Sequence, residues 1–346
     1  MRAAVAGKPG QVKVVEFPEP QAGEGDIIVE PLVCGICSTD VKTVQKGAEN
    51  PEYALGHEVA GVVVQAPSQS KWKKGQRVIV APYLPCGTCF YCKHNQPGLC
   101  EHLYDVSINP GGLAERILVA APLAERGTFA IADDVPSEVA ALSEPLGCVI
   151  MGMDIAMFKP GDSVVVIGDG PMGLLAAGAA RGLGASKVIV AGMTQHRLDA
   201  AARYYADHVV DISKEELSPV VQSLTAKRGA DLVVVAVSAG EALKSGINVV
   251  RPGGVVCAFA GVPEGTEIQL DVRKLHYKQY YLTGSSGLAP EHFARALELL
   301  SSRRVDFASL VTARFAFEDV EKAVAYAAGR QGLKAVVTFD KAGRIS

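Results

Sequence analysis

Four cysteines lie close together in the segment CGTCFYCKHNQPGLC of this 346-residue chain. Their spacing is C-x2-C-x2-C-x7-C, and the intervening residues include turn formers such as glycine, proline and asparagine. Thiolates bind zinc tetrahedrally, and a site with four protein ligands leaves no position open for a substrate. We therefore predict a structural zinc site in residues 84–103, here called the cysteine lobe, with the ligands Cys86, Cys89, Cys92 and Cys100.

A second set of metal-binding residue types is spread over the N-terminal half of the chain. Cys37 lies in CGICSTD, His57 and Glu58 lie in GHEVAG, and Glu144 lies in SEPLGC. Catalytic zinc typically has three protein ligands and one position for water or substrate. Each residue also has an ordinary structural interpretation, such as a hydrogen-bonded histidine or a cysteine in the core. Glu144 is expected at a helix start, because Pro145 suits the first helical position.

A glycine-rich loop, Gly168-Asp-Gly170-Pro-Met-Gly173, follows the apolar segment SVVVIG. The first glycine permits a tight turn, the second lets the backbone approach a pyrophosphate, and the third allows close packing of a helix on a strand. The phosphates then lie at the N-terminus of the helix expected over residues 171–183. The motif alone is weak, but between a strand of branched residues and an alanine-rich helix it predicts a dinucleotide site.

The second strand of such a fold commonly ends in an acid that binds the ribose 2′-hydroxyl of NAD. Here the strand KVIVA runs into Gly192-Met193-Thr194-Gln195-His196-Arg197, and no carboxylate is present. The loss of that negative charge leaves room for a 2′-phosphate, which Thr194, His196 and Arg197 could contact. The sequence therefore favours NADP. In the alternative interpretation, NAD binds without the acid, and the two basic residues only begin a solvated helix.

Composition excludes several classes of function. The formal net charge is −3 and no long run of lysine or arginine is present, so no nucleic-acid partner is expected. No segment has about 18 uncharged apolar residues in a row, and the N-terminus does not resemble a signal peptide, so no membrane partner is expected. Eight cysteines in such a chain indicate a reducing compartment, and we expect a cytoplasmic protein.

The chain changes character near residue 160. Before this point, short apolar runs alternate with glycine, proline and asparagine, which is typical of a strand-rich domain with long loops. After it, apolar strands alternate with helices, which indicates an α/β fold with a doubly wound parallel sheet covered on both faces. We predict a catalytic domain over residues 1–155, a dinucleotide-binding domain over residues 156–288 and a C-terminal segment over residues 289–346.

Five motifs occur in a characteristic order: C-x-[ST]-D, GHE-x-x-G, C-x2-C-x2-C-x7-C, EPL and GxGxxG. In this combination the chain resembles the zinc-dependent medium-chain dehydrogenase/reductase family of the alcohol dehydrogenase superfamily, in its polyol (sorbitol-like) and threonine dehydrogenase branch. The likeness covers essentially the whole chain. It implies a GroES-like catalytic domain, to which residues 289–346 return, and a Rossmann domain. It also implies a homodimer or homotetramer.

The resemblance assigns roles to single residues. Cys37, His57 and Glu144 correspond to ligands of the catalytic zinc, and Glu58 to a glutamate that binds zinc directly or lies just outside its ligands. A glutamate in the place of the second cysteine of alcohol dehydrogenases favours the polyol branch. Thr39 corresponds to the catalytic hydroxyl that passes the substrate proton toward the cofactor ribose.

Two further residues near Cys37 leave alternatives open. Lys42 stands where many relatives carry the next histidine of the proton relay, and a charged lysine is a poor proton acceptor unless it is desolvated. This residue either favours a negatively charged or highly hydroxylated ligand or faces solvent. Cys34 forms a C-x-x-C pair with Cys37, so a redox or ligand role is the alternative to a place as a plain neighbour.

The resemblance also places further residues at the cofactor. They lie in the glycine loop or follow the ends of strands, where parallel sheets bind their ligands. Beside the three loop glycines they are Met172, Gly192, Met193, Thr194, Arg197, Ala260, Gly261, Val262, Ser285 and Ser286.

The implied reaction is a hydride transfer between a secondary hydroxyl of a polyol or related alcohol and NAD(P). Zinc would act on the hydroxyl as a Lewis acid. One catalytic and one structural zinc ion per chain are expected. L-Threonine or a simple secondary alcohol is an alternative substrate. A zinc- and nucleotide-binding sensor without catalysis is an alternative of another class, but it would not need Cys37, His57 and Glu144 together.

Overall fold

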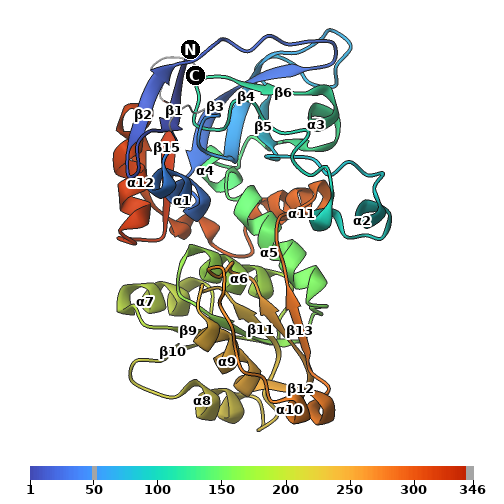
Figure 1. The fold of residues 1–346 in the computed structure, drawn as a ribbon, viewed down its shortest axis with the longest axis vertical. Coiled ribbons are helices and arrows are strands. Elements are labelled where there is room, and N and C mark those ends of the chain that lie inside the picture. The colour runs from blue at the N-terminus through green and yellow to red at the C-terminus, as the bar shows by residue number, and fades with distance from the viewer. Residues whose placement is uncertain (49–52, 340–346) are drawn as a thin grey trace. The chain divides into compact units, whose positions relative to one another are not determined.

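The computed structural model describes residues 1–48 and 53–339, which form two compact units (Figure 1). The first unit comprises residues 1–144, 288–301 and the chain from residue 310 onward, and the second comprises residues 145–287 and 302–309. The boundary after residue 144 lies inside helix α5 (Ser143–Ile155), and the boundary predicted after residue 155 lies at the end of the same helix. Among the described helices, none has both the length and the apolar character that a membrane crossing requires.

The first unit is built around a seven-stranded sheet in the order β14-β15-β3-β4-β5-β7, with β6 also paired to β3. Neighbouring strands are antiparallel, except that β14 and β15 are parallel. Strand β15 from the C-terminal part of the chain pairs directly with β3 from the N-terminal part. The strands are β3 (Ile27–Gly35), β4 (Glu58–Gln65), β5 (Arg77–Val80), β6 (Ile117–Val119), β7 (Thr128–Ala130), β14 (Val311–Ala316) and β15 (Lys334–Thr338).

Short helices and a separate hairpin complete the first unit. The hairpin pairs β1 (Arg2–Ala6) with β2 (Val12–Glu16). Helix α12 contacts both α1, from the N-terminal part of the chain, and β15, from the C-terminal part. The helices are α1 (Ser38–Lys46), α2 (Phe90–Lys93), α3 (Ala121–Arg126), α4 (Ser137–Ala140), α11 (Pro290–Ser301) and α12 (Val320–Ala328), with single 3₁₀ turns at Pro97–Leu99 and Phe317–Asp319.

The second unit contains a six-stranded sheet in the order β10-β9-β8-β11-β12-β13, with every neighbouring pair parallel. Counted within the unit, this is the order 3-2-1-4-5-6 of a doubly wound nucleotide-binding sheet. The elements are β8 (Ser163–Ile167), α6 (Pro171–Gly182), β9 (Lys187–Gly192), α7 (Gln195–Tyr204), β10 (His208–Asp211), α8 (Leu217–Leu224), β11 (Ala230–Val235), α9 (Gly240–Val249), β12 (Val250–Ala258), α10 (Val272–Lys278) and β13 (Tyr281–Gly284).

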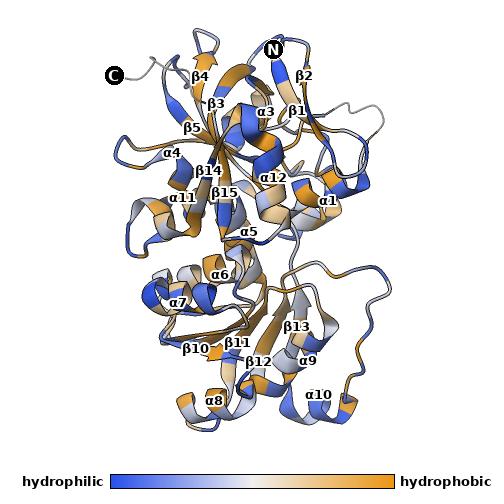
Figure 2. Ribbon diagram, turned by 90° about the vertical axis from the view of Figure 1, so that its left-hand side faces the viewer, coloured by the Kyte–Doolittle hydropathy of each residue, from blue (hydrophilic) through white to orange (hydrophobic). Residues whose placement is uncertain are grey.

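Helices cover this sheet on both faces. Alternate residues of β8, β9 and β11 form one core cluster with residues of α8 and α9, whereas α6 contacts β8 and β9 beside Val166 on the opposite face. Because both faces are buried, β8 has no exposed residue at all, and Figure 2 shows the hydrophobic colouring of the sheet. The predicted α/β class, with a doubly wound sheet and a strand-rich second domain, is confirmed.

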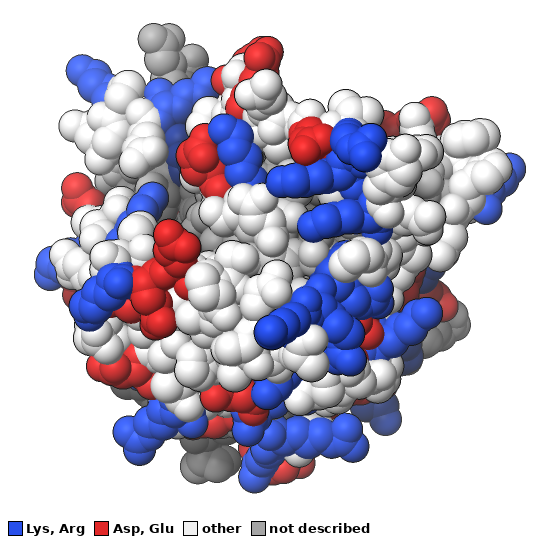
Figure 3. All heavy atoms as spheres, turned by 90° about the horizontal axis from the view of Figure 1, so that it is seen from below, with Lys and Arg blue, Asp and Glu red and all other residues white. Residues whose placement is uncertain are grey.

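Charged side chains of both signs lie on the face that Figure 3 shows. In the view from below, Lys and Arg side chains alternate with Asp and Glu, with more basic side chains toward one side (Figure 3).

Candidate functional site

The four thiols of the cysteine lobe lie around one point. Their sulfur atoms are all within 4.8 Å of one another. The Sγ atoms of Cys86 and Cys92 are 4.0 Å apart, and those of Cys89 and Cys100 are 3.9 Å apart. A zinc ion with Zn–S bonds of about 2.3 Å would hold its tetrahedral ligands about 3.8 Å from one another. The arrangement fits a structural zinc site with four sulfur ligands.

Hydrogen bonds within the lobe favour ionised thiols. Cys86 Sγ accepts from the hydroxyl of Thr88 at 3.5 Å and from the backbone N–H groups of Thr88 and Cys89 at 3.4 and 3.3 Å. The bond from the Thr88 hydroxyl and these N–H groups lower the pKa of Cys86 to about 5. Burial raises the pKa of Cys92 to about 12. A coordinating cation would hold Cys92 as well as Cys86 in the thiolate form, since it removes the thiol proton outright.

Cys37 caps the N-terminus of helix α1. Its backbone N–H donates to Asp40 Oδ2 at 2.9 Å, in the geometry of a capping box. The other oxygen of Asp40 accepts from the backbone N–H of Gly56 at 2.8 Å and lies 3.8 Å from Nδ1 of His57. Because Asp40 is only 3% exposed, a buried carboxylate ties the turn of Cys37 to the turn of His57. No role is predicted for Asp40 from the sequence, although an acid three residues into a helix is a capping signal.

Cys37, His57 and Glu58 form a second group of metal-binding atoms, all within 4.8 Å of one another. His57 directly precedes β4, and Glu58 is the first residue of that strand. Burial acts to lower the pKa of His57, but the hydrogen bond with Cys37 and the charges of Asp40 and Glu144 outweigh burial and raise the pKa well above its usual value. The surplus of negative charge at this place fits a bound cation.

Lys334, the first residue of β15, donates a short hydrogen bond from Nζ to Glu58 Oε1. Both side chains are buried, with 4% and 0% exposure. The other oxygen, Glu58 Oε2, has no hydrogen-bond partner among the described residues. A Cβ atom at Gly35 would lie 2.0 Å from that oxygen, so the glycine leaves the space that the carboxylate fills. A buried carboxylate with one unpartnered oxygen, in a residue grouped with a thiol and an imidazole, again fits a metal ion.

Glu144 lies in the first turn of α5 and is 6% exposed. It is not part of the group formed by Cys37, His57 and Glu58. Its charge opposes the effect of burial on the pKa of both His57 and Lys334 and helps to raise them. The structure thus brings together three of the four predicted ligands of the catalytic zinc, and the role of Glu144 as a ligand stays a prediction.

The neighbours of Cys37 differ in their surroundings. The Cys37 thiol donates to Thr39 Oγ1 at 3.7 Å, so the predicted relay hydroxyl lies beside the predicted ligand. Lys42 is exposed on α1. Cys34 is fully buried, and burial raises the pKa of its thiol well above the usual value. Added Cβ atoms at Gly56 and Gly112 would lie 2.7 and 2.9 Å from its sulfur, so Cys34 is tightly packed in the core and lies outside the metal-binding group.

The glycine loop of the second unit has the geometry of a phosphate-binding turn. Gly168 has a φ of +127°, which favours glycine, and an added Cβ at Gly173 would lie 1.9 Å from the carbonyl oxygen of Gly168. Nothing lies within 4 Å of a Cβ position at Gly170, which caps helix α6. Met172 lies in the first turn of that helix. Helix α6 thus begins where a pyrophosphate could approach the backbone.

The end of β9 contains an acid that comes from another segment. Asp169 Oδ2 accepts from the backbone N–H groups of Met193 at 3.0 Å and Thr194 at 2.7 Å. Arg197 Nη1 lies 3.9 Å from Asp169 Oδ1. A Cβ atom at Gly192 would lie 2.5 Å from Asp169 Oδ2. A carboxylate therefore occupies the place where the sequence predicts a gap in negative charge, and no role is predicted for Asp169 from the sequence.

The remaining predicted cofactor residues follow two neighbouring parallel strands. Ala260, Gly261 and Val262 come after β12, and Ser285 and Ser286 come directly after β13. Val262 is 49% exposed, whereas the hydroxyl oxygen of Ser285 is buried without a hydrogen-bond partner among the described residues. An unsatisfied buried hydroxyl costs about 1–3 kcal/mol, which a bound ligand could relieve.

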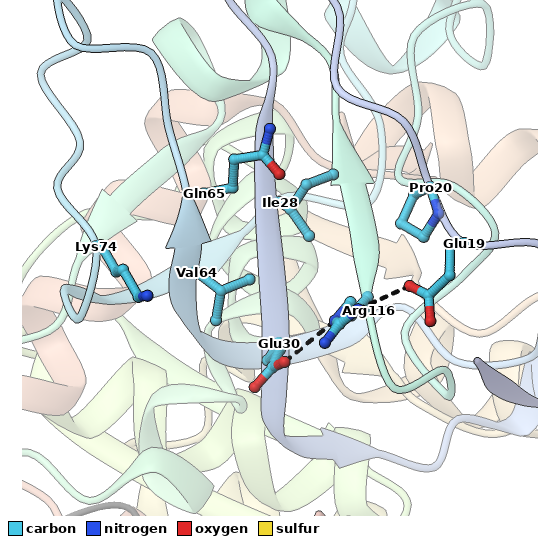
Figure 4. A pocket seen from close by; sticks show the side chains of 8 residues that line it. All are labelled: Glu19, Pro20, Ile28, Glu30, Val64, Gln65, Lys74 and Arg116. Atoms are coloured by element: carbon cyan, nitrogen blue, oxygen red, sulfur yellow. Dashed lines mark hydrogen bonds and ion pairs between the residues drawn. The ribbon is translucent and has the colours of Figure 1, made fainter.

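A hollow elsewhere on the first unit carries no catalytic group. Figure 4 shows Arg116 between Glu19 and Glu30, with ion pairs of 2.9 and 3.2 Å. Both lining carboxylates are thus paired with Arg116, and the lining contains neither cysteine nor histidine. The lining residues are Glu19, Pro20, Ile28, Glu30, Val64, Gln65, Lys74 and Arg116.

Comparisons with known proteins agree with this geometry. Residues 23–125 match the alcohol dehydrogenase GroES-like domain, and residues 171–302 match the zinc-binding dehydrogenase family. Sorbitol dehydrogenase of Bacillus subtilis is 30% identical over 94% of this chain and 92% of its own length. L-Threonine 3-dehydrogenase of Chelativorans sp. is 30% identical over 98% of both chains.

A solved structure gives the same result. A protein of Sinorhizobium meliloti 1021, described as a zinc-binding dehydrogenase bound to NADP, superposes with a TM-score of 0.87 and is 26% identical, over 98% of this chain and 99% of its own. The predicted family is therefore confirmed, together with its need for zinc and a nicotinamide cofactor. The chain belongs to the zinc-dependent medium-chain dehydrogenases, in their polyol and threonine dehydrogenase branch, and is an oxidoreductase that acts on CH–OH groups.

Proposed function

We propose that this enzyme transfers a hydride between a secondary hydroxyl of a polyol or related alcohol and a nicotinamide cofactor. The observation that carries the proposal is the group of Cys37, His57 and the buried Glu58, whose metal-binding atoms lie within 4.8 Å of one another. The similarity to a sorbitol dehydrogenase supports a polyol as the substrate.

The residues of the first unit divide the work. Cys37 and His57 would hold the catalytic zinc, with Glu144 or Glu58 as the carboxylate ligand. One thiolate and one carboxylate balance the charge of Zn²⁺. When bound, zinc supplies Lewis-acid activation of the substrate hydroxyl, and the nicotinamide accepts the hydride. Thr39 would accept the substrate proton at Oγ1, which is exposed and can pass the proton on.

Several further properties belong to the same proposal. They are two zinc ions per chain, one catalytic and one structural, a homodimer or homotetramer, a cytoplasmic location, and the domain limits 1–155, 156–288 and 289–346. The two metal-binding groups support the two zinc ions. The other properties rest on the sequence and its resemblance to the family.

L-Threonine is a second candidate substrate. A threonine 3-dehydrogenase has the same identity to this chain, 30%, as the sorbitol dehydrogenase. The zinc ligands are compatible with either substrate, because both carry a secondary hydroxyl.

The preference between NAD and NADP depends on the end of β9. The sequence favours NADP because no carboxylate follows that strand, and this preference stays a prediction. Its premise is a gap in negative charge at Gly192, and the carboxylate of Asp169 fills that gap. The choice between NAD and NADP therefore depends on whether the Asp169 carboxylate admits a 2′-phosphate.

A substrate panel tests the proposed function. Zinc-loaded enzyme is assayed with polyols, amino alcohols including L-threonine, and simple secondary alcohols, each with NAD and with NADP, and its zinc content is measured by mass spectrometry. We expect about two zinc ions per chain, and the highest kcat/KM with a polyol. Highest activity with L-threonine would favour the second candidate. If no alcohol is oxidised with either cofactor by the fully loaded protein, the proposed function is wrong.

A further inference from the structure

The glycine loop contains an acidic residue that reaches the neighbouring strand. Asp169 follows Gly168 in the turn between β8 and α6, yet its side chain lies at the end of β9. Oδ2 accepts two backbone hydrogen bonds there, from Met193 at 3.0 Å and from Thr194 at 2.7 Å. The Asp169 side chain is 13% exposed, so it is held in place and still reachable from one side.

Gly192 is shaped to accept this acid. A Cβ atom at this position would lie 2.5 Å from both Cβ and Oδ2 of Asp169, closer than such atoms can approach. No residue other than glycine can therefore stand at the end of β9 while Asp169 keeps its position. Gly192 and Asp169 therefore depend on each other. The carboxylate near the end of β9 comes from the glycine loop and not from β9 itself.

The Asp169 carboxylate lies where a 2′-phosphate would approach the protein, beside the start of helix α7. Helix α7 begins after Thr194, and the N–H groups at such a helix start are a natural anion site. Asp169 accepts from the N–H groups of Met193 and Thr194, which directly precede this helix, and the Arg197 guanidinium lies 3.9 Å from its other oxygen. A phosphate group carries a charge of about −1.5 to −2 and would lie beside the Asp169 carboxylate. The negative charges of the phosphate and the carboxylate would repel each other in this partly buried site.

The uncharged 2′-hydroxyl of NAD, in contrast, can donate a hydrogen bond to the Asp169 carboxylate. A carboxylate has roughly four lone-pair positions, and the two backbone N–H groups leave others available to accept a hydrogen bond. A hydrogen bond from a hydroxyl to a charged acceptor is stronger than one between neutral groups. We propose that Asp169 replaces the missing acid of β9 as the residue that binds the adenosine ribose and selects NAD over NADP. This inference rests on the proposed function, since it concerns the same nicotinamide cofactor.

Binding of two fragments isolates this effect from catalysis. Adenosine 5′-monophosphate and adenosine 2′,5′-bisphosphate differ only in the 2′-phosphate, and their dissociation constants for zinc-loaded enzyme are measured by calorimetry without an alcohol. NADH and NADPH are titrated in parallel at fixed ionic strength. We expect the unmodified enzyme to bind the monophosphate and NADH more tightly than their 2′-phosphorylated counterparts.

Two substitutions remove the charge. Asp169→Asn keeps the shape of the side chain, and Asp169→Ala opens the donors. In both, the ratio of the two dissociation constants should shift by roughly tenfold or more toward the 2′-phosphate, because a hydrogen bond to a charged group is worth about one to two factors of ten. The double variant Asp169→Gly with Gly192→Asp removes the Cβ of residue 169 that would otherwise clash. It returns a carboxylate to β9 and should restore preference for the monophosphate.

The matched control is Asp199→Asn on α7. Asp199 is exposed and accepts a hydrogen bond only from Gln195 on its own helix, at 2.9 Å, among the described contacts. Its neutralisation changes net charge equally and should leave the ratio unchanged. A shift as large as that of Asp169→Asn would mean that net charge alone acts, and would overturn the proposal.

Two other results would also contradict it. If the unmodified enzyme prefers the 2′-phosphorylated ligands, or if the ratio in Asp169→Asn stays within about twofold, Asp169 does not select the cofactor. Failure of every nucleotide to bind would instead defeat the proposed function and this inference with it. Circular dichroism and thermal unfolding check that each variant is folded, and Asp169→Asn supplies the test if Asp169→Ala is not.

Discussion

The cysteine lobe and the group of Cys37, His57 and Glu58, here called the dispersed group, both hold metal-binding atoms within 4.8 Å of one another. The two are assembled in opposite ways. The lobe draws four ligands from residues 86–100 alone, and its own backbone N–H groups support the thiolates. The other group joins the end of β3, the start of β4 and, through Lys334, the start of β15. A local cluster can serve as a brace for its segment, whereas a dispersed one depends on a sheet that is folded already.

This difference predicts which substitutions affect chemistry and which affect stability. In the dispersed group the sheet holds the remaining residues after one ligand is lost, so activity falls first. In the lobe, α2 is a single turn without a buried residue, so the segment between the cysteines depends strongly on a bound metal. Stability therefore falls first.

The largest expected effect is that of Cys37→Ala. It removes a ligand of the proposed catalytic zinc, and loss of groups even outside the ligand shell costs about 10–100-fold. We expect kcat/KM to fall by more than roughly 100-fold, with a thermal midpoint close to that of the unmodified enzyme. Cys34→Ala is the control, because it deletes a buried thiol three residues away that lies outside the group. Equal loss of activity in both variants would contradict the assignment of Cys37.

Cys92→Ser tests the lobe in the opposite direction. Its loss leaves three sulfurs, and losing a structural metal is among the few changes that cost more than about 4 kcal/mol. We expect one zinc ion fewer by mass spectrometry and a thermal midpoint lower by on the order of 10 °C. Activity measured well below that midpoint should change much less than in Cys37→Ala. If Cys92→Ser abolishes activity without lowering the midpoint, the two sites have been exchanged.

Sequence alone predicts the local features well, for physical reasons. The glycine loop, the helix over residues 171–183, found at Pro171–Gly182, and the four-cysteine pattern depend on residues adjacent in the chain. Contacts between distant segments leave little trace in a sequence. Lys334 reads as an ordinary charged residue before an apolar strand, and only the pairing of β15 with β3 brings it to Glu58.

Asp169 shows the same limit more sharply. It lies within a motif that the sequence makes plain, and its neighbour Gly192 is identified as unusual. Yet one residue is separated from the other by the whole of α6 and β9, so that their contact follows only from the parallel pairing of β8 with β9. The missing acid and its replacement cannot be connected without the structure.

Lys334→Met tests whether the dispersed group depends on its buried ion pair. The variant leaves the Glu58 carboxylate buried without its partner, and breaking a buried pair in this way costs about 3–5 kcal/mol. We expect this loss in denaturant unfolding of metal-free enzyme, and a smaller loss with saturating zinc, because the metal offers Glu58 another positive charge. Adding Glu58→Gln to the variant should recover part of the stability.

The control for Lys334 is Lys322→Met on α12. Lys322 pairs with Asp319 at 2.7 Å, but both side chains are well exposed, and such pairs contribute only about 0–1 kcal/mol. If Lys334→Met costs no more than Lys322→Met, the buried pair is not what holds Glu58 in place.

The smallest effect is expected for Lys42→Ala, which tests whether the active site extends beyond the dispersed group along α1. Lys42 lies on the same helix as Thr39, but its side chain is exposed. Surface substitutions of this kind usually change stability by less than about 0.5 kcal/mol. We expect kcat/KM for an uncharged alcohol to change by less than about threefold, since a distant charge on the surface is largely screened at physiological salt.

Measurement at low and high salt separates the two interpretations of this lysine. A fall in kcat/KM for a phosphorylated polyol, with none for the uncharged alcohol, would show that Lys42 binds an anionic substrate and would extend the site along α1.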